Sequence, residues 1–110
     1  MEIKLTKEAD KLLAVMYKEY LSRRKEGQGK GSAKYFDWMY LAGLTPISAW
    51  PEGDLSDALN ELKRHGLATV YITGDCELSD DAIAILEDRF VDGLVAVTAY
   101  GVRQLMQIIP

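Results

Sequence analysis

The chain has 110 residues, of which 48% are hydrophobic and 27% are charged, and its formal net charge is -4. This length suits a single domain with its own core, and the apolar content excludes a disordered or fibrous protein. The single cysteine, Cys76, excludes a disulfide scaffold and a cysteine-based metal cluster, which favours a cytoplasmic location.

The N-terminal part of the chain is predicted to form one long helix followed by a glycine-rich loop. Thr6 is a suitable N-cap, and apolar residues recur at helical spacing over residues 12–21. The helix is expected to end near Lys25, because three glycines follow within residues 27–31. A second helix is expected to begin at Ser32.

The second predicted helix runs to about Gly43, and a connector that contains Pro46 leads from it to Trp50. Half of the ten aromatic residues fall in this short stretch of the chain. A helix of this length cannot bury all of its faces, so part of this aromatic set is expected to be core and part to face a partner. The set consists of Tyr35, Phe36, Trp38, Tyr40 and Trp50.

The third predicted helix starts at Pro51 and ends at Gly66. Proline suits the first turn of a helix, because its missing N–H is not needed there, and glycine is a common C-terminal stop. One face of the helix is an apolar stripe that consists of Leu55, Ala58, Leu59 and Leu62.

Residues 67–78 are predicted to form a β-hairpin with a tight turn at Gly74-Asp75. Ser79 is expected to cap a fourth helix, whose inward residues are Ala82, Ile83, Leu86 and Phe90. A last helix is predicted over residues 93–109. Polar residues interrupt it, so it falls short of the ~20 apolar residues of a membrane span, and we expect no membrane association.

Two segments resemble the winged helix-turn-helix superfamily. Lys63-Arg64-His65-Gly66-Leu67 is similar to the "LKxxGL" segment that closes its recognition helix. The segment Leu78-Ser79-Asp80-Asp81-Ala82-Ile83-Ala84-Ile85-Leu86-Glu87 resembles the "LTxxGxxxLE" motif after the wing, with Ala82 in place of the usual glycine. The pattern looks most similar to small bacterial and phage proteins of the YjcQ-like kind and covers roughly residues 6–90.

The resemblance implies an α+β, mostly α fold in one domain, 1–110. Its expected parts are three helices, a β-hairpin wing and two further C-terminal helices. In this superfamily the third helix enters the major groove of double-stranded DNA, which implies a transcription regulator. Here Ser56, Asn60 and Lys63 form one exposed row on that helix. The candidate phosphate contacts are Arg64, Arg23, Arg24, Lys25, Lys30 and Lys34.

The distribution of charge argues against DNA binding. Residues 1–34 carry nine Lys or Arg against five Asp or Glu, whereas residues 35–110 carry four against twelve. The third helix is net acidic, and the hairpin turn has no Lys or Arg. The alternative is therefore a protein-interaction adaptor of phage or mobile-element type with a winged-helix fold and no DNA binding. An aromatic platform for single-stranded nucleic acid is a less favoured alternative.

The C-terminal segment 92–110 is expected to pack as a helix or to mediate a homodimer, because its predicted helix is apolar nearly all round. Leu105→Asp is accordingly expected to produce monomers. The candidate interface residues are Leu94, Val95, Val102, Leu105, Met106 and Ile109.

No catalysis, cofactor or metal is expected. Residues 27–32 lack the contiguous Gly-Lys-Ser of a nucleotide-binding loop, and a predicted helix instead of a strand precedes them. The one histidine, His65, and Cys76 lie on different predicted elements, so they do not form a metal site. Asp75 and Glu77 flank Cys76 and should raise its pKa, which argues against a reactive thiolate.

Overall fold

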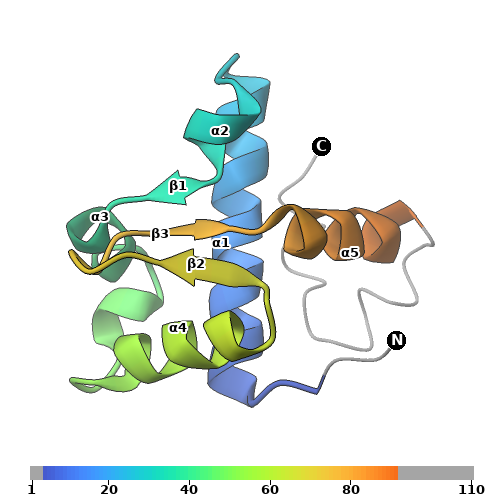
Figure 1. Ribbon diagram of the computed structural model, residues 1–110. Helices are drawn as coiled ribbons and strands as arrows, with labels where there is room; N and C mark the ends of the chain where they lie inside the picture. The colour runs from blue at the N-terminus through green and yellow to red at the C-terminus, as the bar shows by residue number, and fades with distance from the viewer. Residues whose placement is uncertain (1–3, 92–110) are drawn as a thin grey trace.

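The computed structural model describes residues 4–91 (Figure 1). These residues form an α+β fold that is mostly helical, with five α-helices, one short 3₁₀-helix and a three-stranded antiparallel sheet. The α+β, mostly α prediction is confirmed. The predicted last helix lies outside the described residues, as do all six candidate dimer residues.

The first helix, α1 (Lys7–Lys25), is the longest element and confirms the first predicted helix. The Thr6 hydroxyl oxygen accepts a hydrogen bond from the Ala9 N–H at 3.3 Å, so Thr6 is the N-cap. In Figure 1, α1 runs behind the sheet, and it contacts both α2 at one end and α4 at the other. Its position lets it bury one face against the rest of the domain.

The second predicted helix is wrong. Instead of one helix from Ser32 to Gly43, the chain forms the short helix α2 (Lys30–Ala33), the strand β1 (Tyr35–Phe36) and the short helix α3 (Trp38–Ala42). Four helices therefore precede the hairpin, where three were predicted.

Strand pairing explains this difference. Phe36 is fully buried and lies opposite Cys76 in the antiparallel ladder between β1 and β3. Asp37 then starts α3, because its carboxylate accepts a hydrogen bond from the Tyr40 N–H at 3.1 Å. The apolar residues of this stretch are thus divided between two short helices and a two-residue strand that buries Phe36.

A 3₁₀-helix (η1, Ile47–Ala49) leads to α4 (Asp54–Arg64), which corresponds to the third predicted helix. The helix begins three residues after Pro51, so the predicted start at the proline is wrong. Gly53 is the N-cap and has a φ of 92°, a left-handed conformation that glycine adopts readily. The predicted stripe is buried and consists of Leu55, Ala58, Leu59 and Leu62.

The hairpin consists of β2 (Ala68–Val70) and β3 (Cys76–Leu78), and the sheet order is β1-β3-β2. The predicted hairpin is confirmed, but its turn is longer than predicted. The turn spans residues 71–75, because the Tyr71 N–H donates to the Asp75 carbonyl at 2.8 Å. Alternation along β3 buries Cys76 and Leu78.

The last described element is α5 (Asp80–Val91). As predicted, Ser79 caps it, because its hydroxyl oxygen accepts a hydrogen bond from the Ala82 N–H at 3.0 Å. The core contains side chains from α1, α4, α5 and the sheet, among them Leu12, Met16, Phe36, Leu59, Leu62, Leu78 and Ile83. None of the helices within residues 4–91 is long and apolar enough to cross a membrane.

Candidate binding surface

The row predicted to meet DNA bases is exposed on α4. Ser56, Asn60 and Lys63 all lie on its solvent side, and Arg64 beside them is exposed as well. The first turn of the same helix carries Asp54 and Asp57. Only the C-terminal end of this helix is therefore positively charged.

The predicted phosphate contacts do not lie together: Arg64 of α4 is near one end of α1, and the others, from Arg23 to Lys34, are near the opposite end. Glu61 of α4 accepts hydrogen bonds from the Thr6 N–H and the Thr6 hydroxyl, both at 2.7 Å, so α4 is fixed to the start of α1. Arg23 lies near the other end of α1, about 25 Å further along at 1.5 Å per residue. Figure 1 shows α4 at the lower end of α1 and α2 at its upper end.

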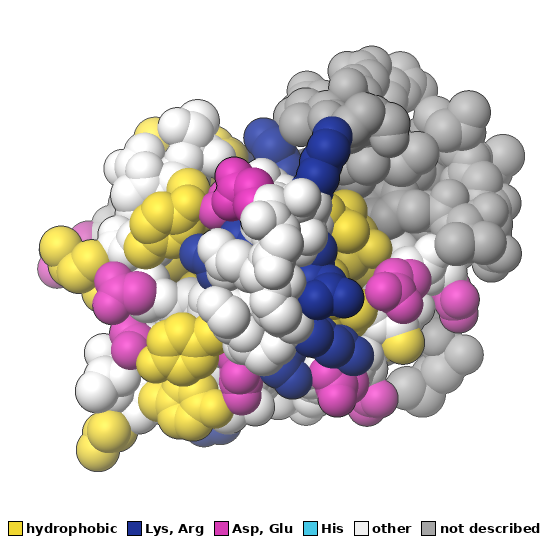
Figure 2. Space-filling model, turned by 90° about the horizontal axis from the view of Figure 1, so that it is seen from above, with side chains coloured by type: hydrophobic (Ala, Val, Ile, Leu, Met, Phe, Trp, Pro, Cys, Tyr) yellow, Lys and Arg dark blue, Asp and Glu magenta, His cyan; other side chains and the backbone are white. Residues whose placement is uncertain are grey.

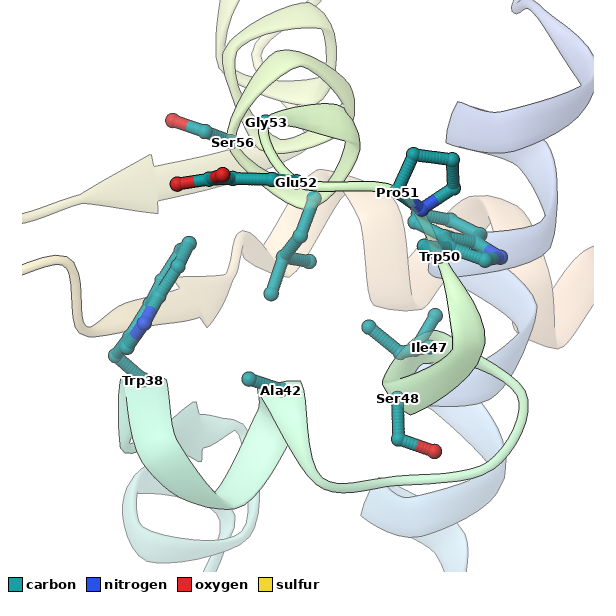
Figure 3. Close-up of a pocket in the computed structure, with 10 residues that line it drawn as sticks. Trp38, Ala42, Ile47, Ser48, Trp50, Pro51, Glu52, Gly53 and Ser56 are labelled. Atoms are coloured by element: carbon teal, nitrogen blue, oxygen red, sulfur yellow. The ribbon is translucent and has the colours of Figure 1, made fainter.

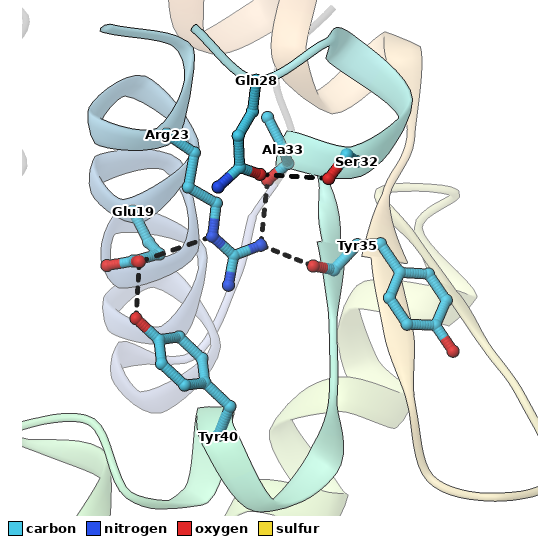
Figure 4. A network of polar contacts seen from close by, with 7 residues as sticks. All are labelled: Glu19, Arg23, Gln28, Ser32, Ala33, Tyr35 and Tyr40. Atoms are coloured by element: carbon cyan, nitrogen blue, oxygen red, sulfur yellow. Dashed lines mark hydrogen bonds and ion pairs between the residues drawn. The ribbon is translucent and has the colours of Figure 1, made fainter. Parts of the chain in front are cut away.

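Arg23 belongs to an internal network (Figure 4). Its Nη1 donates to the carbonyls of Tyr35 at 2.6 Å and Ala33 at 3.3 Å, and its Nε pairs with Glu19 at 3.4 Å. The guanidinium also stacks 4.5 Å from the centre of the Phe36 ring, and the side chain is only 14% exposed. Arg23 thus attaches β1 to α1.

The other predicted cations surround the glycine-rich loop, where Figure 2 shows Lys and Arg side chains gathered. Arg24 donates to a carbonyl of that loop at 3.1 Å, and Lys25 is exposed. Lys30 and Lys34 both pair with Asp80, at 3.5 and 3.1 Å. Part of the positive charge of this end is therefore neutralised within the chain.

Exposed hydrophobic side chains gather in one region, which the sequence revealed only in part: of the aromatic set expected to be partly core and partly exposed, Phe36 is buried, whereas Tyr35 and Tyr40 are exposed. Among the described residues, all five large exposed ones lie on β1, α3 and the turn 71–75: Tyr35, Met39, Tyr40, Tyr71 and Ile72. Figure 2 shows such side chains on the left, interleaved with carboxylates. We call Tyr35, Met39, Tyr71 and Ile72 the hairpin-tip surface; Met39 is 76% exposed and Ile72 completely so.

Asp75 connects the hairpin turn to the neighbouring elements. Its carboxylate accepts hydrogen bonds from the Trp38 N–H at 2.9 Å and the Tyr35 hydroxyl at 2.7 Å, and these bonds lower the pKa of Asp75. The hydrogen bond between the Tyr35 hydroxyl and Asp75 also raises the pKa of Tyr35 to about 12. The Tyr71 hydroxyl donates to Glu77 at 2.7 Å, and the rings of Tyr35 and Tyr71 lie 6.0 Å apart. Both phenols are therefore held in place.

A cleft with a volume of about 270 Å³ lies between α3, η1 and the start of α4 (Figure 3). We call it the α3–α4 cleft. Trp38 and Trp50 lie on opposite sides of it, and Glu52 lies along its upper edge in Figure 3. The remaining surface of the cleft is mostly apolar and includes Ala42, Ile47 and Leu55.

Trp38 joins the cleft to the hairpin-tip surface. A Cβ placed on Gly74 of the hairpin turn would lie only 3.4 Å from the Trp38 ring, so the turn packs directly on this indole. The segment that builds the cleft, residues 35–62, contains five carboxylates and no Lys, Arg or His. Hairpin tip and cleft therefore form one continuous, apolar and acidic region.

The chemistry of Cys76 agrees with the sequence prediction. Burial, together with the negative charges of the neighbouring Asp75 and Glu77, raises the pKa of this thiol to about 12. The thiol is buried, and its pKa is shifted in the direction that the flanking carboxylates predict. Within residues 4–91, no three His, Cys, Asp or Glu side chains are grouped so that they could hold a metal ion.

Two sequence signals could have indicated the surface. Residues 35–62 lack any basic residue although they contain both tryptophans of the chain, and Ile72 stands in a hairpin turn, where polar residues are usual. Comparisons of the chain with protein-family models, with curated proteins and with solved structures find no match. The function is therefore inferred from the chemistry of this surface.

Proposed function

We propose that this chain is a non-catalytic winged-helix protein that binds another protein through its hairpin-tip surface. The order of its elements supports the winged-helix interpretation: α1, α2, β1, α3, η1, α4 and then the β2–β3 hairpin, with β1 added to the edge of β3. In this interpretation α4 corresponds to the recognition helix and the turn 71–75 to the wing. Proteins with a fold of this kind have several different functions, so the proposed function is based on the exposed side chains and charges of the surface.

The concentration of exposed hydrophobic side chains at the hairpin tip carries the proposal. Single exposed apolar residues are normal on a protein surface, whereas a group of them marks an interaction site. Tyrosine and methionine are enriched at protein interfaces. Because Asp75 and Glu77 already hold the two phenols, little side-chain freedom is lost when a partner binds.

The charge of the same region favours a protein over a nucleic acid. Asp37, Asp75 and Glu77 lie among the hydrophobic side chains, and residues 35–62 supply no cation. Phosphate groups would be repelled here, because nucleic-acid binding depends on local positive charge. A protein partner with basic residues around an apolar patch fits both properties.

Affinity capture with a paired variant tests this proposal. Met39→Gln together with Ile72→Gln removes two exposed apolar side chains, so the stability should change by no more than about 0.5 kcal/mol. We expect one captured protein to be lost with this variant and retained with the control Asn60→Ala, on α4. Capture of the same proteins by wild type and variant would contradict the proposal.

DNA binding is a second candidate, favoured by the exposure of Ser56, Asn60 and Lys63 on α4. If duplex DNA binds, Lys63→Glu should weaken binding and reduce the salt slope by about 1. Arg24→Glu tests the other end of α1 better than Arg23, which has an internal role. Absence of salt-dependent binding by wild type at low ionic strength would reject this candidate.

A further inference from the structure

We infer that the α3–α4 cleft receives an arginine side chain of the partner protein. This inference rests on the proposed function and names the chemistry of the partner. The cleft adjoins the hairpin-tip surface through Trp38, whose ring packs against Gly74 of the hairpin turn. A segment bound across the hairpin tip can therefore place one side chain in the cleft.

The size of the cleft favours a side chain over a cofactor or metabolite. Its volume is about 270 Å³. Pockets that bind small molecules usually measure about 300–1,000 Å³ and enclose most of the ligand. This cleft is smaller and only partly enclosed, so it suits the end of one inserted residue.

The composition of the cleft suits arginine. Its two indole rings, Trp38 and Trp50, offer flat faces on which a planar, weakly hydrated guanidinium can stack. Ala42 and Leu55 provide apolar surface for the aliphatic part of the side chain. Arginine is also enriched among the residues that contribute most to protein–protein binding.

The charges around the cleft select a cation. Glu52 lines it, and Asp54 and Asp57 follow in the first turn of α4. On α3, the N-cap is Asp37, and η1 carries no charge. No Lys, Arg or His lies in residues 35–62 to balance these carboxylates. A carboxylate at the edge of an aromatic cleft can accept two parallel hydrogen bonds from a guanidinium.

The fluorescence of tryptophan measures occupancy of the cleft directly, because the only two tryptophans of the chain both line it. The probe is the capped tripeptide acetyl-Leu-Arg-Leu-amide, titrated into the full chain. Two comparison peptides carry citrulline, which has the same shape without the charge, or glutamate. We expect a saturable change of emission with the arginine peptide, a weaker response to citrulline and none to glutamate.

Glu52→Gln tests the charge with almost no change of shape. Because the side chain is exposed, the arginine peptide should bind about two- to fivefold more weakly to this variant, with a smaller dependence on salt. Glu26→Gln is the matched control at the far end of α1 and should bind like wild type. Trp38→Phe and Trp50→Phe each leave one reporter, and the remaining tryptophan should still respond.

Equal responses to the arginine and glutamate peptides, or no response to arginine at millimolar concentration, would overturn the inference. These peptide titrations use the wild-type chain alone, so their outcome does not depend on whether a variant folds. If the arginine peptide has no effect but capture still depends on Met39 and Ile72, only this inference fails. If capture is also unaffected by the paired variant, the proposed function fails with it.

Discussion

A basic residue in the sequence can have its whole side chain engaged inside the domain. Arg23 was predicted to contact phosphate, yet its guanidinium binds two backbone carbonyls, pairs with Glu19 and lies over the rings of Phe36 and Tyr40. Its neighbour Arg24 makes one contact, to a loop carbonyl. Two adjacent arginines therefore have different roles.

We predict that Arg23→Ala lowers the free energy of unfolding by about 2 kcal/mol, because hydrogen bonds from a charged donor to two backbone carbonyls are lost, one of them part-buried. Arg24→Ala is the matched control and should change it by less than about 0.5 kcal/mol, since its side chain is exposed. Urea denaturation of both variants measures the difference. Equal effects of the two substitutions would contradict the role given to Arg23.

Glu61 is a second residue whose role depends on a distant partner. Burial raises its pKa, but the hydrogen bonds from Thr6 and the charges of Arg64 and His65 outweigh burial and lower the pKa below its ordinary value of 4.5. A carboxyl group with a lowered pKa in the folded state stabilises the protein above its ordinary pKa. That contribution is lost as the pH falls through the lowered value.

Glu61→Gln should therefore reduce the free energy of unfolding at neutral pH by less than about 1 kcal/mol, since solvent screens the interactions of the Glu61 carboxylate with its partners. The difference from wild type should shrink as the pH falls below 4.5. Thermal melts of both proteins from pH 3 to pH 7 test this expectation, with Glu26→Gln as control. A difference that grows in acid would contradict it.

At the scale of elements, the sequence predicted those that are determined locally. α1, α4 and α5 have an apolar stripe, and α1 and α5 also have a clear N-cap, Thr6 and Ser79. β1 has only two residues, and its partner β3 lies some forty residues further along the chain. The pairing of Phe36 with Cys76 is a tertiary contact that overrides helix propensity, and no local pattern reveals it.

The candidate site was predictable only in part for the same reason. The excess of aromatic residues near Trp38 was visible in the sequence. Its connection to the hairpin was not, because it depends on Asp75 binding Trp38 and Tyr35 across the sheet. The net acidic charge of α4 was predicted correctly from the sequence. The distance between its cations and Arg24 and Lys25 could not be predicted, because it depends on how α1 is oriented in the fold.

The start of α4 can be tested at Gly53, whose φ of 92° puts it in the left-handed region. We predict that Gly53→Ala lowers the free energy of unfolding by about 1–2 kcal/mol, because a residue with a Cβ is strained there. Gly31→Ala is the matched control: it lies in α2 with open space around it, so alanine should be neutral or slightly stabilising. Similar losses for both variants, measured by urea denaturation, would contradict this account of the helix start.

At the scale of the whole molecule, charge and hydrophobicity divide the surface. The end that carries the glycine-rich loop is basic, whereas the side formed by β1, α3 and the hairpin turn is acidic and apolar. The net charge of -4 conceals this division. Under the proposed function, a partner that binds the second side needs basic and apolar groups together, which fits a protein segment better than the backbone of a nucleic acid.

Site-specific photo-crosslinking tests this central claim most directly. A benzophenone side chain replaces Ile72, which is completely exposed, and in a control it replaces Glu8, which is exposed on α1. Irradiation in cells that produce the chain should give one defined protein adduct from position 72 that position 8 does not give. The Met39→Gln substitution should weaken that adduct. Identical adducts from both positions, or a nucleic-acid adduct from position 72, would contradict the claim.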